Sequence, residues 1–139
     1  MPQKTFTLEI VTPDRVVISD DEVVSLIAPG VEGYLGILAN HAPLMTELAV
    51  GEITMRRSSG EELHFASSQG FMEVADNKVT ILSDSVEKAQ EIDVERARQS
   101  LSRAQERLSF SSKEGIDFAR AEAAMKRALN RLRVAEHSL

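Results

Sequence analysis

The sequence predicts an α+β fold, in which an N-terminal β-sandwich or flattened barrel is followed by a C-terminal antiparallel two-helix hairpin. Short runs of alternating apolar and polar residues fill the first part of the chain, and a spacing of three and four residues replaces them in the last third. All four prolines lie before residue 44, and the only glycine after Gly70 is Gly115. Turn-forming residues are therefore concentrated in the first region, and we predict two domains, residues 1–86 and 87–139.

The first predicted strand contains Phe6, Leu8 and Ile10, which alternate with polar residues before a turn at 12–14. Later β-rich runs are separated by residues 58–60 and 75–77, whose Ser-Ser-Gly and Ala-Asp-Asn sequences are typical of hairpin turns. Many short strands at close spacing are typical of a sandwich or a barrel. The further strands are expected at residues 16–18, 22–28, 52–57, 61–66, 71–74 and 78–82.

A glycine-rich segment, GVEGYLG, occupies residues 30–36. Its glycines do not have the spacing of a dinucleotide-binding loop, and no helix is expected to follow it. We interpret the segment as tight turns within the β domain.

Two helical segments follow, at residues 92–108 and 118–135. In each, apolar residues recur at steps of three and four and form a seam, with alanine at every d position. The polar linker 109–115 is short, so the helices are expected to pack antiparallel. Because alanine seams bury little apolar surface, the hairpin must dock on the β domain, on a partner or on each in turn, as a two-state element.

Six arginines lie on these helices at matching positions. When the seams are numbered as heptads, four fall at c and two at g, which face the same way in an antiparallel pair. Like charges at neighbouring positions repel by about 0.2–0.5 kcal/mol per pair, and only Asp93 and Asp117 share the flank. Guanidinium binds phosphate in bidentate fashion, so the pattern predicts an anion site, with a solvated basic face as the alternative. The six are Arg96, Arg103, Arg107, Arg120, Arg127 and Arg131.

Length and charge restrict the possible functions. The chain has 139 residues, of which 42% are hydrophobic, and this suits one ordinary domain with a small appendage. Its net charge of −6 divides unevenly: residues 1–91 carry 6 Lys/Arg against 15 Asp/Glu, and residues 92–139 carry 10 against 7. The acidic larger region argues against nucleic acid as a partner.

The sequence lacks the usual signatures of catalysis and of metal binding. It has no cysteine and no GxxxxGK[ST] phosphate loop. The spacing of His41, His64 and His137 is not that of metal ligands, and we interpret each as a surface or packing residue. No apolar run approaches the roughly 20 residues that span a bilayer, and the N-terminus has no signal-like apolar core. We expect a soluble, cytoplasmic protein that binds rather than catalyses, with no metal site.

Two stretches of the chain resemble the epsilon subunit of the bacterial F-type ATP synthase. GVEGYLGILANHAPLM at residues 30–45 resembles that family's glycine-rich loop. SSQGFMEVADNKVTILSDSVEKAQEIDVERA at residues 67–97 resembles its passage from the last strands into the first helix. The resemblance extends from residue 1 to about residue 136, in the same order of β-sandwich and helical hairpin.

The resemblance implies a non-catalytic central-stalk subunit of the proton-translocating ATP synthase. The β domain would contact the gamma subunit and the c-subunit ring and couple rotation to catalysis, which implies a peripheral position at the cytoplasmic face of the cell membrane. The hairpin would alternate between a folded state and an extended state, in which it reaches acidic segments of the alpha/beta catalytic head and inhibits ATP hydrolysis. In some members, notably from bacilli, the folded hairpin binds ATP, which implies ATP as a regulatory ligand, with or without magnesium.

The resemblance also assigns roles to residues. Glu87 and Asp93 each have a plainer interpretation as well, Glu87 as a solvated loop carboxylate and Asp93 as the N-cap of the first helix. The predicted ATP-binding residues are Glu87, Ile92, Asp93, Arg96 and Ala97 on the adenosine side, and Arg103, Arg127 and Arg131 on the phosphate side. The predicted rotor contacts are Glu32, Tyr34 and His41.

This chain departs from the family pattern in the loop. The usual Glu-Leu-Gly-Ile-Xaa-Pro-Gly-His reads Tyr-Leu-Gly-Ile-Leu-Ala-Asn-His at residues 34–41, without the acidic residue and the Pro-Gly pair. Glu32 could supply the missing charge. Two alternatives stay open: a free-standing nucleotide sensor, and an adaptor whose arginine flank docks acidic protein surfaces and never binds nucleotide.

Overall fold

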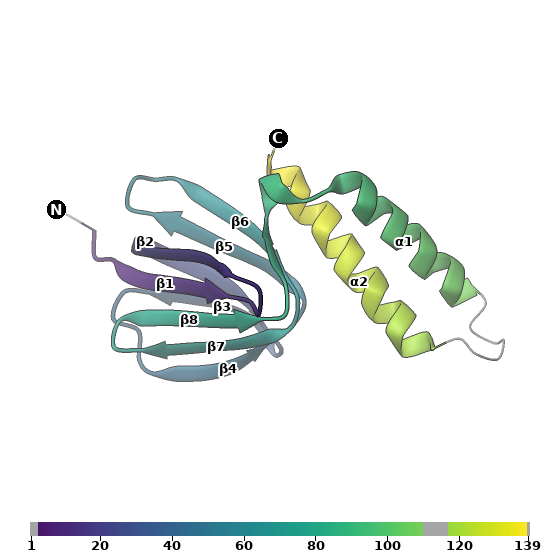
Figure 1. Ribbon diagram of the computed structural model, residues 1–139. Coiled ribbons are helices and arrows are strands. Elements are labelled where there is room, and N and C mark those ends of the chain that lie inside the picture. The colour runs from purple at the N-terminus through teal and green to yellow at the C-terminus, as the bar shows by residue number, and fades with distance from the viewer. Residues whose placement is uncertain (1–2, 110–116, 139) are drawn as a thin grey trace. The chain divides into compact units, whose positions relative to one another are not determined.

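The computed structural model describes residues 3–109 and 117–138. The chain divides into two compact units, Met1–Lys88 and Ala89–Leu139, which are described separately. The N-terminal unit is built of strands and the C-terminal unit of helices (Figure 1). Most of the predicted linker, residues 110–115, lies outside the described residues.

The N-terminal unit contains nine strands in one sheet that closes on itself. The spatial order is β1-β8-β7-β4-β2-β5-β6-β9, β3 pairs with β2, and β1 pairs with β2 as well as with β8. This closure makes the flattened barrel that the sequence predicts. Only the β1–β8 pairing is parallel among the strand pairs described. The strands are β1 (Phe6–Val11), β2 (Val16–Gly30), β3 (Gly33–Leu38), β4 (Leu44–Leu48), β5 (Gly51–Arg57), β6 (Glu62–Ser67), β7 (Gly70–Ala75), β8 (Lys78–Ser83) and β9 (Val86–Lys88).

The core of this unit follows from the alternation along the strands. In β7, Met72 and Val74 are buried while Phe71 and Glu73 face outward. Successive side chains of a strand point to opposite faces, so each strand contributes every second residue to one shared interior. The largest fully buried side chains include Phe65, Leu8, Ile10, Leu26, Ile37, Leu48, Ile53 and Met55.

The predictions for two regions of the N-terminal unit were wrong. The runs 16–18 and 22–28 belong to a single strand, β2, although Ser19, Asp20 and Asp21 separate them. The polar stretch stays extended because β1 pairs with it and because Arg57 Nε donates a hydrogen bond of 2.7 Å to Asp20 Oδ2. In the glycine segment, predicted as tight turns, only residues 31–32 form a turn, and Gly33 already begins β3, which was not predicted as a strand.

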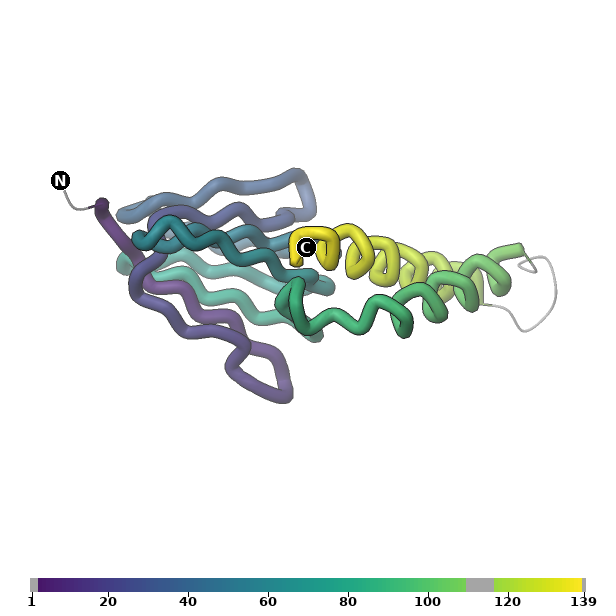
Figure 2. The backbone as a smooth tube through the Cα atoms, turned by 90° about the horizontal axis from the view of Figure 1, so that it is seen from above, coloured from purple at the N-terminus to yellow at the C-terminus, as the bar shows by residue number. Residues whose placement is uncertain are grey.

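The C-terminal unit is an antiparallel pair of helices, α1 (Val94–Ser109) and α2 (Phe118–Ala135), with short 3₁₀ turns η1 (Ala89–Glu91) and η2 (Glu136–Ser138). Figure 2 shows the two helices side by side. The alanine seam is confirmed, since Ala97, Ala104, Ala121 and Ala128 are each at most 3% exposed. Among the described residues no helix is long and apolar enough to cross a membrane.

A second side of α2 is buried in addition to the seam. Asn130 and Val134, which the heptad numbering places away from the seam, are 8% and 0% exposed. Within this unit α2 contacts η1 as well as α1. The sequence analysis missed this side because a single amphipathic seam assigns only one buried stripe to each helix.

Candidate functional site

Both helices of the hairpin begin with the same capping arrangement. The backbone N–H of Arg96 donates to Asp93 Oδ1 at 3.0 Å, and that of Arg120 donates to Asp117 Oδ1 at 3.0 Å. An aspartate at this position satisfies one of the free N–H groups at a helix start. The two carboxylates of the arginine flank are therefore both N-caps. Because Asp93 is the N-cap, α1 begins at Val94 and not at residue 92.

The caps belong to a repeat that relates the two helices. Residues 93–108, DVERARQSLSRAQERL, align with residues 117–132, DFARAEAAMKRALNRL, at a constant offset of 24. The repeat aligns Arg96 with Arg120, Arg103 with Arg127, and Arg107 with Arg131. Because α1 and α2 are antiparallel, Arg96 and Arg120 lie at opposite ends of the hairpin, whereas Arg103 and Arg127 both lie near its middle. The flank therefore carries arginines along its whole length.

The arginines of this flank are exposed or half-buried. Arg127 and Arg131 are half-buried, and the other four are exposed. Arg103 donates a hydrogen bond of 3.3 Å to Ser100 Oγ on its own helix. Arg96 and Arg103 stand seven residues apart, about 10.5 Å along the helix axis. The flank thus offers several guanidinium groups within the length of one extended phosphate-bearing ligand.

The two flanks of the hairpin differ in how their charges are paired. The opposite flank of the hairpin carries charges of both signs and is called the mixed flank: there Arg98 pairs with Glu95 at 3.7 Å and Lys126 pairs with Glu122 at 3.4 Å. On the arginine flank, the part of the chain that the structure describes contains no carboxylate in an ion pair with Arg96, Arg103, Arg107, Arg120 or Arg127. Carboxylates within the described residues therefore do not neutralise these five arginines, and the gathering of the arginines on one flank stays a prediction.

The remaining residues of the predicted ATP site lie in different surroundings. Ile92 and Ala97 are buried, at 8% and 2% exposure. Glu87 belongs to β9 of the N-terminal unit, where it pairs with Ala66 of β6 and is half-buried. Its interpretation as a loop carboxylate is therefore wrong. Its role in ATP binding, like that of the other residues in the predicted site, stays a prediction.

The predicted rotor contacts lie on the β2–β3 hairpin and on the connection that follows it. Glu32 is exposed at the tip, and Tyr34 is 60% exposed on β3. The Tyr34 hydroxyl accepts a hydrogen bond of 3.2 Å from the backbone N–H of Glu52. His41 lies after β3, with Nδ1 at 2.7 Å from the carbonyl oxygen of Ala42.

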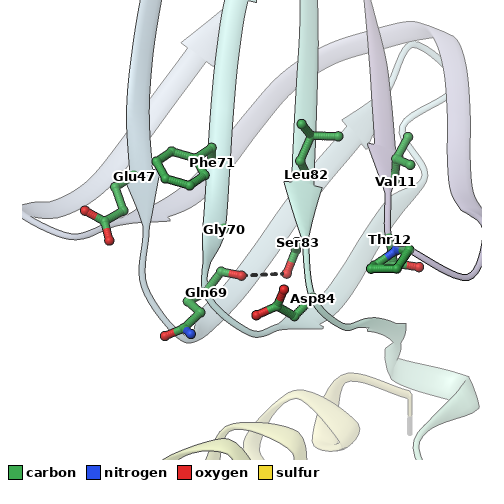
Figure 3. A pocket seen from close by; sticks show the side chains of 10 residues that line it. Val11, Thr12, Glu47, Gln69, Gly70, Phe71, Leu82, Ser83 and Asp84 are labelled. Carbon is green, nitrogen blue, oxygen red and sulfur yellow. Dashed lines mark hydrogen bonds between the residues drawn. The ribbon is translucent and has the colours of Figure 1, made fainter.

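An exposed apolar row crosses the outer face of β1, β8 and β7. Val11 of β1 pairs with Leu82 of β8, and Leu82 pairs with Phe71 of β7. On its other side Phe71 pairs with Glu47 of β4. Phe71 and Leu82 are 56% and 53% exposed and lie side by side in Figure 3. They line a hollow of about 540 Å³, whose rim carries the carboxylates of Glu47 and Asp84.

The sequence analysis assigned Phe71 and Leu82 to strands but missed this surface. The sequence does contain a signal for an exposed apolar surface, because each strand has two adjacent apolar residues: Phe71 and Met72 in β7, and Ile81 and Leu82 in β8. Two adjacent apolar residues in one strand must face opposite sides of the sheet, so one of them is exposed unless another layer covers it.

A cluster of ionisable side chains lies on β5 and β6. His64 Nδ1 is 2.7 Å from Glu52 Oε1, and His64 Nε2 is 3.1 Å from Glu62 Oε1. Arg56 donates a hydrogen bond of 3.1 Å to Glu62, and this bond is the main cause that lowers the pKa of the Glu62 carboxyl. His64 thus holds neighbouring strands together through carboxylates, which is a structural role.

Comparisons with known proteins match the two units in order. The family described as "ATP synthase, Delta/Epsilon chain, beta-sandwich domain" matches residues 5–89, and the family described as "ATP synthase, Delta/Epsilon chain, long alpha-helix domain" matches residues 90–136. The ATP synthase epsilon chain of Moorella thermoacetica is 50% identical over 131 residues, 94% of this chain and 96% of the relative. That of Syntrophomonas wolfei is 45% identical over 139 residues and covers both chains completely.

Solved structures give the same result at the level of the fold. A chain in the structure of the Euglena gracilis mitochondrial ATP synthase, which contains OSCP, F1 and the c-ring, has a TM-score of 0.81 and 25% identity, with 96% of this chain and 82% of that chain covered. A chain in the central stalk and c-ring structure of the Tetrahymena thermophila mitochondrial ATP synthase has a TM-score of 0.57 at 17% identity, and supports the fold alone.

Proposed function

This chain belongs to the epsilon chains of ATP synthase, non-catalytic subunits of the central stalk, and on that premise we propose that it couples the rotor and regulates ATP hydrolysis. In this proposal the β-barrel unit binds the gamma subunit and the c-subunit ring. The subunit then lies at the cytoplasmic face of the membrane as a peripheral part of the enzyme. The helical hairpin is the regulatory element.

The apolar row is the surface that suits the stalk best. Phe71 and Leu82 are exposed neighbours beside the half-buried Val11, and exposed apolar patches with a polar rim are typical of protein contacts. The carboxylates at the rim favour a basic partner surface. Phe71→Glu should lower the affinity for the gamma subunit at least tenfold, whereas Ser59→Glu, which adds the same charge in an exposed turn, should not.

The regulatory part of the proposal is carried by the arginine flank. Five of its arginines have no ion-pair partner in the described part of the chain, and both aspartates beside them are occupied as N-caps. An external anion would relieve the repulsion between these charges and form charge-assisted hydrogen bonds with them. We assign this role to ATP, bound by the phosphate-side arginines and by the adenosine-side residues named above.

ATP would act as a switch because only the packed hairpin brings the arginines of both helices together. A ligand shifts a conformational equilibrium by the difference between its affinities for the two states. ATP bound across α1 and α2 therefore favours the folded hairpin over the extended, inhibitory form. Magnesium can accompany the triphosphate, since phosphate oxygens are its usual ligands.

Calorimetric titration of the full chain with ATP tests this assignment. Arg103→Ala and Arg127→Ala should each weaken binding by about 1.5–3 kcal/mol, the contribution of a hydrogen bond to a charged group. Arg98→Ala is the matched control, because Arg98 lies on the mixed flank and is paired with Glu95. Unchanged ATP affinity in both the Arg103 and Arg127 variants would reject the site.

The second candidate function is an adaptor whose arginine flank docks acidic protein segments. The same unpaired arginines favour it, because guanidinium binds carboxylate as well as phosphate. If millimolar ATP, ADP and GTP do not bind, and if Arg103→Ala still relieves inhibition of ATP hydrolysis in the reconstituted enzyme, the flank belongs to this second function. A free-standing nucleotide sensor would instead bind ATP normally after Phe71→Glu and would have no affinity for the gamma subunit.

A further inference from the structure

The β2–β3 hairpin has one open edge. Among the described strands, β3 pairs with β2 alone, over six consecutive residue pairs without a bulge. Pro29 pairs with Tyr34, and because proline has no N–H, this pair cannot exchange the two hydrogen bonds of an antiparallel ladder. The Pro29 carbonyl instead accepts a bond of 2.8 Å from the N–H of Ala49, on the side away from β3.

The position of Pro29 fixes the direction of the backbone groups along β3. Hydrogen-bonded and non-hydrogen-bonded pairs alternate, so Tyr34, Gly36 and Leu38 all belong to non-hydrogen-bonded pairs. Their N–H and C=O groups point away from β2. Within residues 3–109 and 117–138 none of these groups has a hydrogen-bond partner.

This edge carries none of the usual protection against strand addition. Natural edge strands are blunted by lysine, proline, a bulge or a short length. Residues 33–38, Gly-Tyr-Leu-Gly-Ile-Leu, contain no charge and no proline, and the register is regular throughout. The side chains beside the edge are apolar and exposed: Tyr34 at 60%, Leu38 at 65% and the neighbouring Ile27 at 46%.

The edge is also held in place at both ends. At one end the Tyr34 hydroxyl accepts a hydrogen bond from the N–H of Glu52. It packs closely over Gly51, because a Cβ atom added to Gly51 would lie 2.9 Å from the hydroxyl and 2.5 Å from Pro29 Cβ. At the other end the N–H of Asn40 donates a bond of 2.7 Å to Asn77 Oδ1. A rigid edge loses little conformational entropy when a partner binds.

We propose that β3 is a strand-addition site, at which an extended segment of another protein in the assembly pairs with the backbone of Tyr34, Gly36 and Leu38. This inference rests on the proposed function, because it requires a partner in the stalk or rotor. Backbone hydrogen bonds supply the affinity, and alternate side chains of the incoming strand contact Tyr34 and Leu38.

Charge selects the kind of partner. Glu32 stands exposed at the tip beside this edge, within a region of 6 Lys/Arg against 15 Asp/Glu at residues 1–91. Self-pairing through β3 would bring two strongly acidic units together, which like-charge repulsion disfavours. The occupant is therefore an extended segment of a different protein, with apolar residues at alternate positions and lysine or arginine at the end that meets Glu32.

The substitution Gly36→Pro tests whether the backbone of β3 binds a partner strand. The Gly36 N–H points away from β2, so Gly36→Pro removes an edge donor without breaking the β2–β3 ladder, and Gly36→Ala is the matched control that keeps the N–H. A Cβ atom at this position meets nothing within 4 Å. Full-length variants are titrated onto ATP synthase from which this subunit has been removed. Gly36→Pro should lower the affinity about tenfold, and Gly36→Ala should leave it unchanged.

Amide hydrogen exchange supplies a readout that does not depend on a variant. In the free chain the amides of Tyr34, Gly36 and Leu38 should exchange fast, and in the assembled enzyme they should become protected. Leu38→Lys, which protects edges in natural sheets, replaces Gly36→Pro if the proline variant does not fold. Fast exchange in the assembled enzyme together with wild-type affinity of the edge variant would overturn the proposal.

Two other outcomes have distinct meanings. If the wild-type chain itself does not bind the depleted enzyme, the proposed function fails, and with it the premise of this inference. If sedimentation shows that the free chain forms a dimer that Gly36→Pro dissociates, the edge pairs with a second copy, and the assignment to a different protein is overturned.

Discussion

Asp93 and Asp117 make the same hydrogen bond in the two helices, yet only Asp93 belongs to the predicted ATP site. Each accepts a backbone N–H at 3.0 Å from the residue three positions on. Both aspartates are exposed. Loss of an N-cap costs about 0.5–2 kcal/mol, typically about 1. Asp93→Ala and Asp117→Ala should therefore destabilise the hairpin equally, by about 1 kcal/mol each.

ATP binding should separate the two variants. Asp93→Ala should lower ATP affinity, whereas Asp117→Ala should lower it only as far as the common loss of helix stability does. Asp93→Asn keeps the cap, because asparagine caps as well as aspartate. Any effect of this variant on ATP affinity therefore reports the carboxylate charge and not the fold of the helix.

Two assays are sufficient for this comparison. Urea unfolding of the full chain, followed by circular dichroism at 222 nm, measures helix stability, and calorimetry measures ATP affinity. If Asp117→Ala reduces ATP affinity as strongly as Asp93→Ala, the role of Asp93 is capping alone. If the two alanine variants differ in stability by more than the spread of cap energies, the equivalence of the two helix starts is wrong.

Three further predictions concern stability. Gly70→Ala should destabilise the barrel by about 1–3 kcal/mol in urea unfolding, because a Cβ atom would lie 2.0 Å from the carbonyl oxygen of Leu82; wild-type stability would show that β7 and β8 separate easily. Ala128→Leu should destabilise the hairpin by a similar amount, since Ala128 is 0% exposed in the seam, and a gain in helix stability would mean that the seam has unfilled space. The pKa of Glu62 is lowered, chiefly by its bond to Arg56, so this carboxylate adds stability above its unfolded pKa that is lost as pH falls through its folded pKa. Arg56→Ala should therefore make the fall in stability from about pH 5 to pH 3 shallower, by the few tenths of a kcal/mol that an exposed pair contributes, and an unchanged slope would contradict this.

The strands that sequence predicts well are those whose burial alternates without interruption. β1, β7 and β8 have this pattern, and their predicted and observed bounds agree closely. Three strands were not predicted: β3 was interpreted as part of the glycine turns, and β4 and β9 are only five and three residues long. β2 was divided in two because its polar centre is held by Arg57, which lies 37 residues from Asp20 in the chain. No local pattern contains such a contact.

The site shows the same division between local and long-range information. The arginine flank and the capping role of Asp93 follow from helix periodicity and from capping chemistry, both of which are local. The position of Glu87 on a strand depends on its pairing with Ala66, 21 residues earlier in the sequence, and was not predicted. The open edge of β3 depends on which strands fail to pair with it, and only the complete sheet reveals this.

The hairpin is well suited to switching because its own packing contributes little. Ala97, Ala104, Ala121 and Ala128 are buried in the seam, but each adds only one methyl group, at about 0.8 kcal/mol per buried carbon. These contacts order helices of 16 and 18 residues, which are marginal in isolation. A ligand present at a hundred times its Kd adds about 2.7 kcal/mol to the state that binds it. That is close to the contribution of the four buried alanines, so an anion on the arginine flank can determine whether the two helices stay packed.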